Sequence, residues 1–438
     1  MSAVKQNLST CHAKLIRFDT FDRRKLPRFH VEVTINSAPE PRSPRPGADP
    51  STSSGSAGAI LDLVRTGRAS TRGELAAITG LARSTIAQRV DALISHRLLV
   101  PGGDSASTGG RRPTRLAFNG DAGVVLAGDL GATHSRVAVA DLAGHVLVQD
   151  VHDIAVAEGP ERVLSWLEET FERLLLEIGG TGDDVRGIGV GLPGPVEFAT
   201  GRPVSPPIMP GWNLYPVGQR LGERFSAPAL VDNDVNIMSL GEYWSNWRAE
   251  EFLLFVKVGT GIGSGIVTHG HVHRGADGAA GDIGHIHVPD HDDVVCRCGN
   301  LGCLEAIAGG AALAAGLREL GLDAPTGRDV VAQVLHGQHD AVRLIRQAGH
   351  AIGGVLATCV NMLNPAVVVI GGDMAAAGEP LLAGIREAVY RRSLPLATGS
   401  LRIVPSELGD EAGIIGAAVM VIETILAPAA VDALVSAI

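Results

Sequence analysis

Hydrophobic residues recur at helical spacing near the start of the chain, between residues 59 and 96. Ile60, Leu61 and Val64 mark one face of a first helix ending near residue 67. Thr71 and Glu74 have the capping-box spacing that begins a second, short helix, which ends before Gly80. A third helix is expected over 83–96, with its inward face formed by Ile86, Val90, Leu93 and Ile94.

Two short apolar stretches, 98–100 and 114–118, come next and flank a turn rich in glycine and arginine (109–113). This pattern predicts a β-hairpin after the third helix. Three short helices followed by a basic hairpin are typical of a winged helix-turn-helix domain, here expected over residues 57–120. The alternative is a small helical bundle used for protein contacts.

From residue 121 the chain alternates short apolar strands, glycine-rich turns and longer amphipathic helices. A strand–turn–strand unit is predicted at 124–141 around the turn 131–134, and a similar unit at 252–268 around the turn 259–263. Helices are expected over 161–178 and 340–363, and a buried strand over 366–370. The repeated unit predicts an α/β body, residues 121–438, with two similar lobes facing a cleft.

Residues 1–56 have a different composition from the rest of the chain. Between residues 37 and 58 they are rich in Pro, Ser and Gly, and such a segment buries too little apolar surface to offset its chain entropy. We expect a disordered leader and linker here, with an over-assigned translation start as the alternative.

The net charge of the 438-residue chain, -10, argues against a nucleic-acid partner until it is divided along the sequence. Residues 1–120 carry 18 Lys and Arg against nine Asp and Glu, whereas residues 121–438 carry 19 against 38. Such asymmetry suggests a basic arm for a polyanion joined to an acidic body.

The basic residues of the predicted winged helix-turn-helix domain lie where DNA contacts are expected. The third helix can enter a major groove, where Gln88 and Arg89 would reach base edges, and the hairpin arginines would reach phosphates or a minor groove. The candidate DNA-binding residues are Arg83, Ser84, Thr85, Gln88, Arg89, Arg111 and Arg112.

Three of the five cysteines fall within eight residues: Cys296, Cys298 and Cys303. With His285 eleven residues upstream they form a His/Cys₃ set, the usual ligand composition of structural zinc. The alternative is a reactive thiol cluster with the histidine elsewhere. No signal peptide opens the sequence, and no apolar stretch is long enough to span a bilayer, so a cytoplasmic protein is expected.

Two glycine-rich turns are candidates for phosphate binding. Backbone N–H groups of Gly131 and Thr133, and of Gly259, Thr260 and Gly261, are placed to cradle phosphates. Asp129, at a predicted strand end, would hold magnesium. The alternative for each turn is an ordinary hairpin.

Asn233 and Asp234 follow a short apolar strand, where cleft residues usually lie. A carboxylate beside an amide suits the hydroxyls of a polyol, and with ATP present Asp234 could act as the base on the attacking hydroxyl. The alternative is an Asx turn that caps a helix.

These motifs together resemble the ROK family (repressor, open reading frame, kinase), from about residue 57 to the C-terminus. The most specific match is Gly281-Asp-Ile-Gly-His285, followed by the cysteine cluster and Glu305. Supporting matches are the Asp129 turn, the Gly191-Leu-Pro-Gly-Pro195 segment, Asn233-Asp234 and Gly371-Gly372, the last of which adds Gly371 and Gly372 as candidates for phosphate or nucleotide contact.

The resemblance implies a two-lobed actin-like/hexokinase-type (ribonuclease H-like) fold behind a winged helix-turn-helix domain. It implies structural zinc in the loop 285–303, held by His285, Cys296, Cys298 and Cys303. It also implies a sugar site formed by Asn233, Asp234, Asp282, His285 and Glu305, so that His285 would contact both zinc and sugar.

The family contains both sugar kinases and sugar-responsive repressors. An N-terminal winged helix is the repressor arrangement, and three positions depart from the kinase pattern: Ala132, Asp282 and Asp373. We therefore predict a DNA-binding regulator with an operator DNA, a sugar effector and a homodimer or homotetramer, and no membrane partner. The alternatives are a sugar kinase using Mg-ATP, with Asp234 as its base, and a zinc-dependent interaction scaffold.

Overall fold

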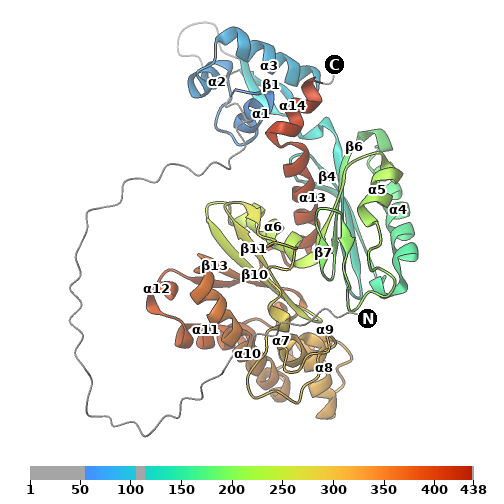
Figure 1. The fold of residues 1–438 in the computed structure, drawn as a ribbon, viewed down its shortest axis with the longest axis vertical. Helices are drawn as coiled ribbons and strands as arrows, with labels where there is room; N and C mark the ends of the chain where they lie inside the picture. Colours follow the sequence, from blue (N-terminus) through green and yellow to red (C-terminus); the bar gives the residue numbers. More distant parts are fainter. Residues whose placement is uncertain (1–54, 105–113, 437–438) are drawn as a thin grey trace, which may run out of the picture. The chain divides into compact units, whose positions relative to one another are not determined.

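The computed structural model describes residues 55–104 and 114–436 of the chain. The leader predicted over residues 1–56 lies outside this range except for its last two residues. Figure 1 shows the described elements coloured along the sequence.

The N-terminal elements lie where the hydrophobic spacing predicts them: α1 (Ala57–Arg65), α2 (Arg72–Thr79) and α3 (Arg83–Ser95), then the antiparallel strands β1 (Leu99–Asp104) and β2 (Thr114–Phe118). The capping box of α2 is present, with the Thr71 side chain accepting from the Glu74 N–H and the Glu74 carboxylate accepting from the Thr71 N–H. Ile86, Val90 and Leu93 are fully buried on the inner face of α3.

The first of two five-stranded sheets has the order β5-β4-β3-β6-β9. Strand β3 pairs antiparallel with β4 and parallel with β6, as expected for a strand–turn–strand unit followed by a crossover. Side chains alternate between the two faces of β3: Leu126 packs with α4 and α5, and Val125 packs with α13. The bounds are β3 (Val124–Leu130), β4 (Ser135–Asp141), β5 (Val146–His152), β6 (Val185–Leu192), β9 (Ala229–Asn233), α4 (Pro160–Glu177), α5 (Val217–Phe225) and α13 (Ala412–Ile425).

The second sheet repeats this arrangement in the order β12-β11-β10-β13-β14, with β10 antiparallel to β11 and parallel to β13. The internal repeat predicted from the sequence is thus present in the fold. One difference is that β11 begins at Ile262, inside the predicted turn 259–263, because Ile262 pairs with Val258. The bounds are β10 (Phe252–Val258), β11 (Ile262–Thr268), β12 (His271–Val272), β13 (Val367–Gly371) and β14 (Arg402–Pro405).

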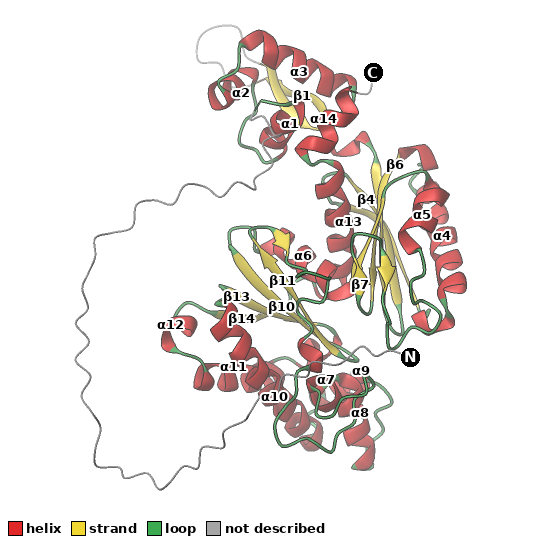
Figure 2. Ribbon diagram, viewed as in Figure 1, coloured by secondary structure: helices red, strands yellow, loops and turns green. Residues whose placement is uncertain are grey.

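Helices cover both faces of the second sheet (Figure 2). Leu254 and Val256 of β10 pack on α10 and α11, whereas Leu253 and Phe255 pack on α6. The helices of this lobe are α6 (Asp234–Asn246), α7 (Leu304–Ala308), α8 (Gly310–Glu319), α9 (Gly327–Leu335), α10 (His339–Leu363), α11 (Glu379–Arg392) and α12 (Pro395–Thr398). Short elements complete the body: β7 (Val196–Glu197), β8 (Arg202–Pro203) and 3₁₀ turns at Gly120–Ala122, Val156–Glu158, Gly182–Asp184, Ile283–His285, Asp373–Ala377 and Gly409–Glu411.

Helices α6 and α13 pack against each other where the two lobes meet. A Cβ on Gly416 would lie 1.7 Å from the Ile237 carbonyl oxygen, and one on Gly241 would lie 2.2 Å from the Ala412 carbonyl oxygen. The two glycines therefore allow backbone-to-backbone contact between these helices. The C-terminal helix α14 (Pro428–Ser436) continues from α13 and packs on α1.

Helix α13 is strongly apolar. Among the described residues, no single helix has the length and apolar composition to cross a membrane, and only the bent pair Gly409–Ile425 and Pro428–Ser436 meets both criteria jointly. Most of α13 is buried, including Ile414, Val419 and Val421.

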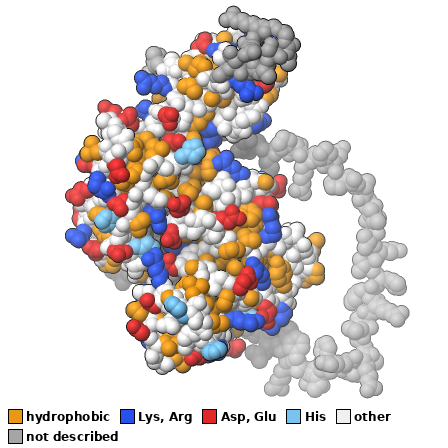
Figure 3. All heavy atoms as spheres, turned by 180° about the vertical axis from the view of Figure 1, so that it is seen from behind, with side chains coloured by type: hydrophobic (Ala, Val, Ile, Leu, Met, Phe, Trp, Pro, Cys, Tyr) orange, Lys and Arg blue, Asp and Glu red, His pale blue; other side chains and the backbone are white. Residues whose placement is uncertain are grey.

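Acidic and basic side chains are mixed with apolar ones over the face drawn in Figure 3.

Candidate ligand cleft and metal site

A cleft of about 1060 Å³ is lined by the strand ends and turns of both sheets. Asp129 comes from the end of β3, Asp234 from the start of α6, Lys257 from β10 and Gly372 from the turn after β13. The carboxyl ends of parallel strands meet at one edge of a sheet, so the repeated topology brings these distant residues together.

All five residues predicted to contact a sugar line this cleft: Asn233, Asp234, Asp282, His285 and Glu305. Glu305 is held in place, because its Oε2 accepts a hydrogen bond of 3.2 Å from the Ile262 N–H. A Cβ on Gly261 would lie only 1.9 Å from the same oxygen. Gly261 is predicted to bind phosphate. In the structure its lack of a side chain also provides the space that the Glu305 carboxylate occupies.

Asn233 caps α6, which was the alternative interpretation of the Asn-Asp pair. Its Oδ1 accepts from the Val235 N–H at 2.9 Å and the Asn236 N–H at 3.3 Å, and its Nδ2 donates to the Gly194 carbonyl oxygen. One amide hydrogen remains for a ligand in the cleft. Capping and cleft lining are therefore compatible at this residue.

A buried ion pair behind the cleft, absent from the sequence prediction, fixes this segment. The Asp232 carboxylate is 1% exposed and accepts from Arg274 at 2.7 Å and from the Asn236 side chain at 2.8 Å. It also accepts from the Asn233 backbone N–H. The network holds the start of α6 rigidly against the strand end.

Asp234 makes an ion pair that the sequence analysis also missed. Its Oδ2 lies 2.6 Å from Nζ of Lys257, and its side chain is 6% exposed. The available signal was a single charged residue in the otherwise apolar strand FLLFVKV, but spacing alone does not identify its partner.

Asp129 lines the same cleft and contacts the first turn of α13. Burial raises the pKa of Asp129 to about 6, with the Lys257 ammonium acting in the opposite direction. A carboxylate with this pKa is a poorly solvated group, and its negative charge is destabilising above that pH.

Most of the residues predicted to bind phosphate line the same cleft. Asp129, Gly131, Thr133, Gly259, Thr260, Gly261 and Gly372 line it. Gly371 does not: it lies in β13, and a Cβ there would meet the Phe255 ring at 2.4 Å. Gly371 is thus explained by core packing.

A series of polar contacts joins the two lobes at this cleft. Arg328 contacts the His134 ring Nε2 at 3.0 Å and the Asp373 carboxylate at 3.4 Å. Burial and the Arg328 guanidinium lower the pKa of His134, which favours a neutral ring that accepts from the arginine. The Asp373 carboxylate is paired with the Arg328 guanidinium.

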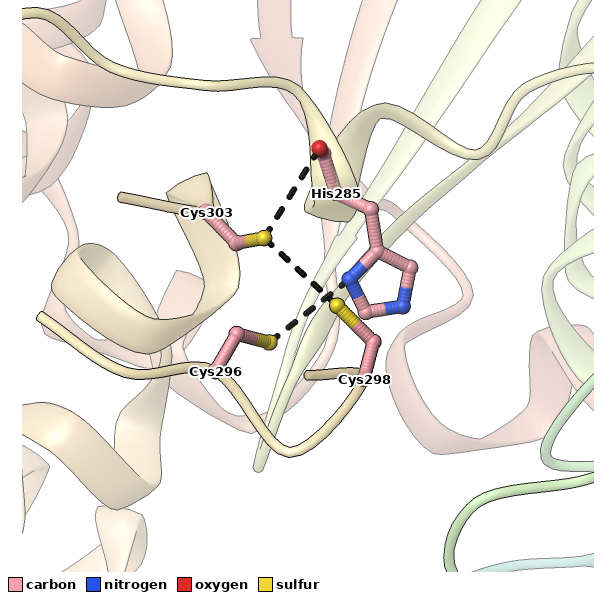
Figure 4. Close-up of side chains that lie close together, drawn as sticks. All are labelled: His285, Cys296, Cys298 and Cys303. Atoms are coloured by element: carbon pink, nitrogen blue, oxygen red, sulfur yellow. Dashed lines mark hydrogen bonds between the residues drawn. The ribbon is translucent and has the colours of Figure 1, made fainter. Parts of the chain in front are cut away.

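The four predicted metal ligands converge, as Figure 4 shows. The ligand atoms of His285, Cys296, Cys298 and Cys303 all lie within 4.8 Å of one another. His285 Nδ1 is 3.7 Å from Cys296 Sγ, and Cys298 Sγ is 3.7 Å from Cys303 Sγ. A tetrahedral ion with metal–sulfur bonds of about 2.3 Å requires ligand–ligand separations of roughly 3.8 Å, so the group can hold a metal ion.

The chemistry of these ligands also fits a cation. Burial raises the pKa of the Cys303 thiol to about 12, so a thiolate forms there only with a positive charge beside it. His285 directs Nδ1 toward Cys296, which leaves Nε2 on the other side of the ring.

The candidate DNA-binding residues of α3 differ in exposure. Arg83, Ser84 and Gln88 are exposed, whereas Thr85 and Arg89 are half-buried. Arg89 is therefore less available than the helical spacing suggested. The predicted hairpin residues Arg111 and Arg112 lie outside the described residues.

A family model named ROK matches residues 125–424, which is more than half of the chain. The chain belongs to the ROK family. The motif-based resemblance and the two-lobed fold are thereby confirmed.

Within the ROK family, repressors and kinases match different lengths of this chain. A xylose repressor from Caldicellulosiruptor bescii is 29% identical over 84% of this chain and 95% of its own length. A glucokinase from Thermotoga maritima is 30% identical, but over 68% of this chain and 96% of its own. A solved ROK transcriptional regulator, a homologue of the E. coli MLC protein, has a TM-score of 0.73 and 26% identity, covering 86% of this chain and 98% of its own.

Proposed function

We propose that this chain is a sugar-responsive, DNA-binding transcriptional regulator that represses carbohydrate-metabolism genes. The observation that carries the proposal is the set of three helices and a hairpin, α1 to β2, in front of the ROK region. The regulators of the family match 84% and 86% of the chain, whereas the glucokinase match covers about two thirds of it. The domain division 57–120 and 121–438 and the cytoplasmic location belong to this proposal.

In this proposal the cleft binds the sugar effector. Asp234, Asp282 and Glu305 accept hydrogen bonds from sugar hydroxyls, and the remaining Asn233 amide hydrogen donates to one. These roles are supported by the position of all four residues along one cleft, whose volume is large enough for a sugar.

The His/Cys₃ group holds structural zinc in the same proposal. Four protein ligands leave no open position, so the ion would order the loop 285–303 and would not activate water. Since Nδ1 of His285 faces the thiols, Nε2 is the atom available to the sugar. Zinc would in this way fix the ring that contacts the effector.

Operator DNA binds through α3 and the hairpin. Arg83, Ser84 and Gln88 present an exposed polar face at the N-terminal half of α3, the part of a recognition helix that reaches base edges. A two-fold operator needs two copies of the domain, which agrees with the predicted homodimer or homotetramer.

Helices α13 and α14 are the structural route from the cleft to the DNA-binding elements. The start of α13 contacts Asp129, and Arg65 of α1 pairs with Glu423 near its end, at 2.5 Å. In α14, the Asp432 side chain accepts from the Gly58 N–H at 2.9 Å. A sugar that binds the open and closed cleft with different affinity would shift α1 through these contacts.

The decisive experiment is a gel shift with the native upstream region, with and without candidate sugars. We expect a sequence-specific complex at moderate salt that one sugar weakens. If no specific complex forms under these conditions, the regulator proposal is wrong.

A sugar kinase is the second candidate, because Asp129 and Asp234 are both retained at the cleft. In that case Mg-ATP would bind at the glycine turns and Asp234 would accept the proton of the attacking hydroxyl. An ADP-release assay over a panel of sugars tests this function. Turnover that is abolished by Asp234→Asn would favour the kinase.

A further inference from the structure

A lysine side chain reaches the cleft from the middle of the second sheet. Lys257 lies on β10, between Val256 and Val258, both of which are fully buried. Its own side chain is 27% exposed and lines the cleft. A charged side chain in such a strand is retained only where it is paired.

The partner of Lys257 is Asp234, and Asp129 lines the same cleft. The Asp234 carboxylate, 6% exposed, accepts from the lysine ammonium at 2.6 Å. Burial lowers the pKa of Lys257, but the negative charges of Asp234 and Asp129 outweigh burial, so the pKa lies above its ordinary value. The lysine is therefore charged at neutral pH, with both acids close to it.

Two carboxylates at the ends of strands of the first sheet, β3 and β9, line one cleft, and carboxylate oxygens are the ligands that Mg²⁺ prefers. Here a protein cation is already paired with Asp234. A divalent ion entering this place would be repelled by the ammonium and would find both oxygens of Asp234 already hydrogen-bonded, Oδ2 to Lys257 and Oδ1 to the Val235 N–H.

We propose that the Lys257 ammonium is a resident cation of the cleft, which replaces an exchangeable divalent ion between Asp129 and Asp234 and withdraws Asp234 from proton transfer. This inference deepens the regulator proposal and rests on it for its biological meaning. Lys257 is accordingly a specificity-determining residue: it makes the cleft a sugar-binding site that needs neither Mg²⁺ nor nucleotide.

The test is Mg²⁺ binding to the zinc-loaded full chain, measured by isothermal titration calorimetry without DNA or sugar. Lys257→Met keeps most of the length of the side chain and removes its charge. We expect Mg²⁺ to bind this variant at least about tenfold more tightly than the wild type, because a nearby positive charge has been removed. Adding Asp129→Asn should abolish the gain.

Two further variants are controls. Lys257→Arg keeps the charge and should bind Mg²⁺ no better than the wild type. Arg402→Met removes a cation from an ion pair with Glu250, whose residues do not line the cleft, and should also show no gain. If Lys257→Met does not fold, the double variant Lys257→Met/Asp234→Asn removes both charges and should recover most of the lost thermal stability.

The outcomes separate this inference from the function on which it rests. Wild-type Mg²⁺ binding as tight as that of Lys257→Met would overturn the resident cation, whatever the gel shifts show. Sugar binding that requires Mg-ATP in the wild type would also overturn it. Failure of every gel shift, together with the expected metal result, would overturn only the regulator.

Discussion

The Asp129 carboxylate lies against Gly413, the second residue of α13. A Cβ built on Gly413 would be 2.0 Å from Oδ2 of Asp129 and 2.5 Å from its Cγ. The cleft acid and the helix that leads toward α1 are therefore in direct contact, with no space between them.

Gly413→Ala should displace this carboxylate and lower stability. The added methyl group meets three atoms of Asp129, and overpacking of this kind costs about 1–3 kcal/mol in the free energy of unfolding. Thermal denaturation measures the loss, and the sugar-induced change in operator affinity should shrink as well. Gly182→Ala is the control, because its Cβ would have open space around it. Equal stability of the two variants would contradict the contact.

Asp129→Asn should stabilise the protein in a pH-dependent way. The pKa of Asp129 is raised from 3.8 to about 6 in the folded chain, so between these values the folded state holds a proton that the unfolded state has released. The free energy of unfolding therefore falls as pH rises from about 4 to about 6, by up to about 3 kcal/mol. The asparagine variant, which imitates the protonated acid, should gain that amount above pH 6 and nothing below pH 4.

Chemical denaturation at several pH values measures this difference. Asp410→Asn, an exposed carboxylate at the same cleft, controls for the loss of one negative charge. A gain for Asp129→Asn that is independent of pH would show that ionisation of this residue does not cause it.

Cys298→Ser should lower zinc content and sugar affinity together. Cys298 is exposed at the edge of the group, and its loss leaves three ligands. We expect less than about half an equivalent of zinc by metal analysis and a sugar affinity reduced by roughly tenfold or more, since His285 would lose its fixed orientation. Cys359→Ser, in α10, should change neither quantity. Loss of zinc with unchanged sugar affinity would separate the metal from the effector site.

Local patterns in the sequence were sufficient to predict the helices and strands and the convergence of the four metal-site residues. Each of these patterns depends on residues close together in the chain. They are the apolar run of β10, the helical spacing of α3, the capping box at Thr71 and the spacing of the three cysteines. The repeated strand–turn–strand unit predicted the two lobes, and the family resemblance added the actin-like/hexokinase type of the fold.

Side-chain partners across the fold were not predictable in this way. Lys257 and Asp234 are 23 residues apart, and Arg328 and His134 are 194 apart, so their pairing depends on how sheets and lobes are placed. Asn233 illustrates a second limit: its residue type fits both a helix cap and a sugar contact, and only the structure shows that it caps α6.

Substitutions on α3 should separate base recognition from phosphate contact. Gln88→Ala should reduce the preference for operator over scrambled DNA by about tenfold, because a side chain that reads a base edge is lost. Arg83→Ala should weaken both DNAs alike and reduce the slope of log affinity against log salt by about 1. Fluorescence anisotropy at several salt concentrations measures both effects. Arg343→Ala, on α10, is the control; an equal effect there would exclude α3 as the contact surface.

Arg65→Met should weaken communication between the cleft and the DNA-binding elements. The Arg65 guanidinium pairs with Glu423 of α13 and with Asp62 of its own helix, and its side chain is 14% exposed. Without it, α13 loses a directional contact with α1, while the surface of α3 is unchanged. Operator affinity without sugar should stay near the wild-type value, and the sugar-induced change in affinity should fall several-fold. Arg72→Met removes a comparable pair, with Asp91, that lies wholly within the N-terminal elements, so it should leave the sugar response intact. If both variants respond to sugar as the wild type does, the signal does not pass through Arg65 and Glu423.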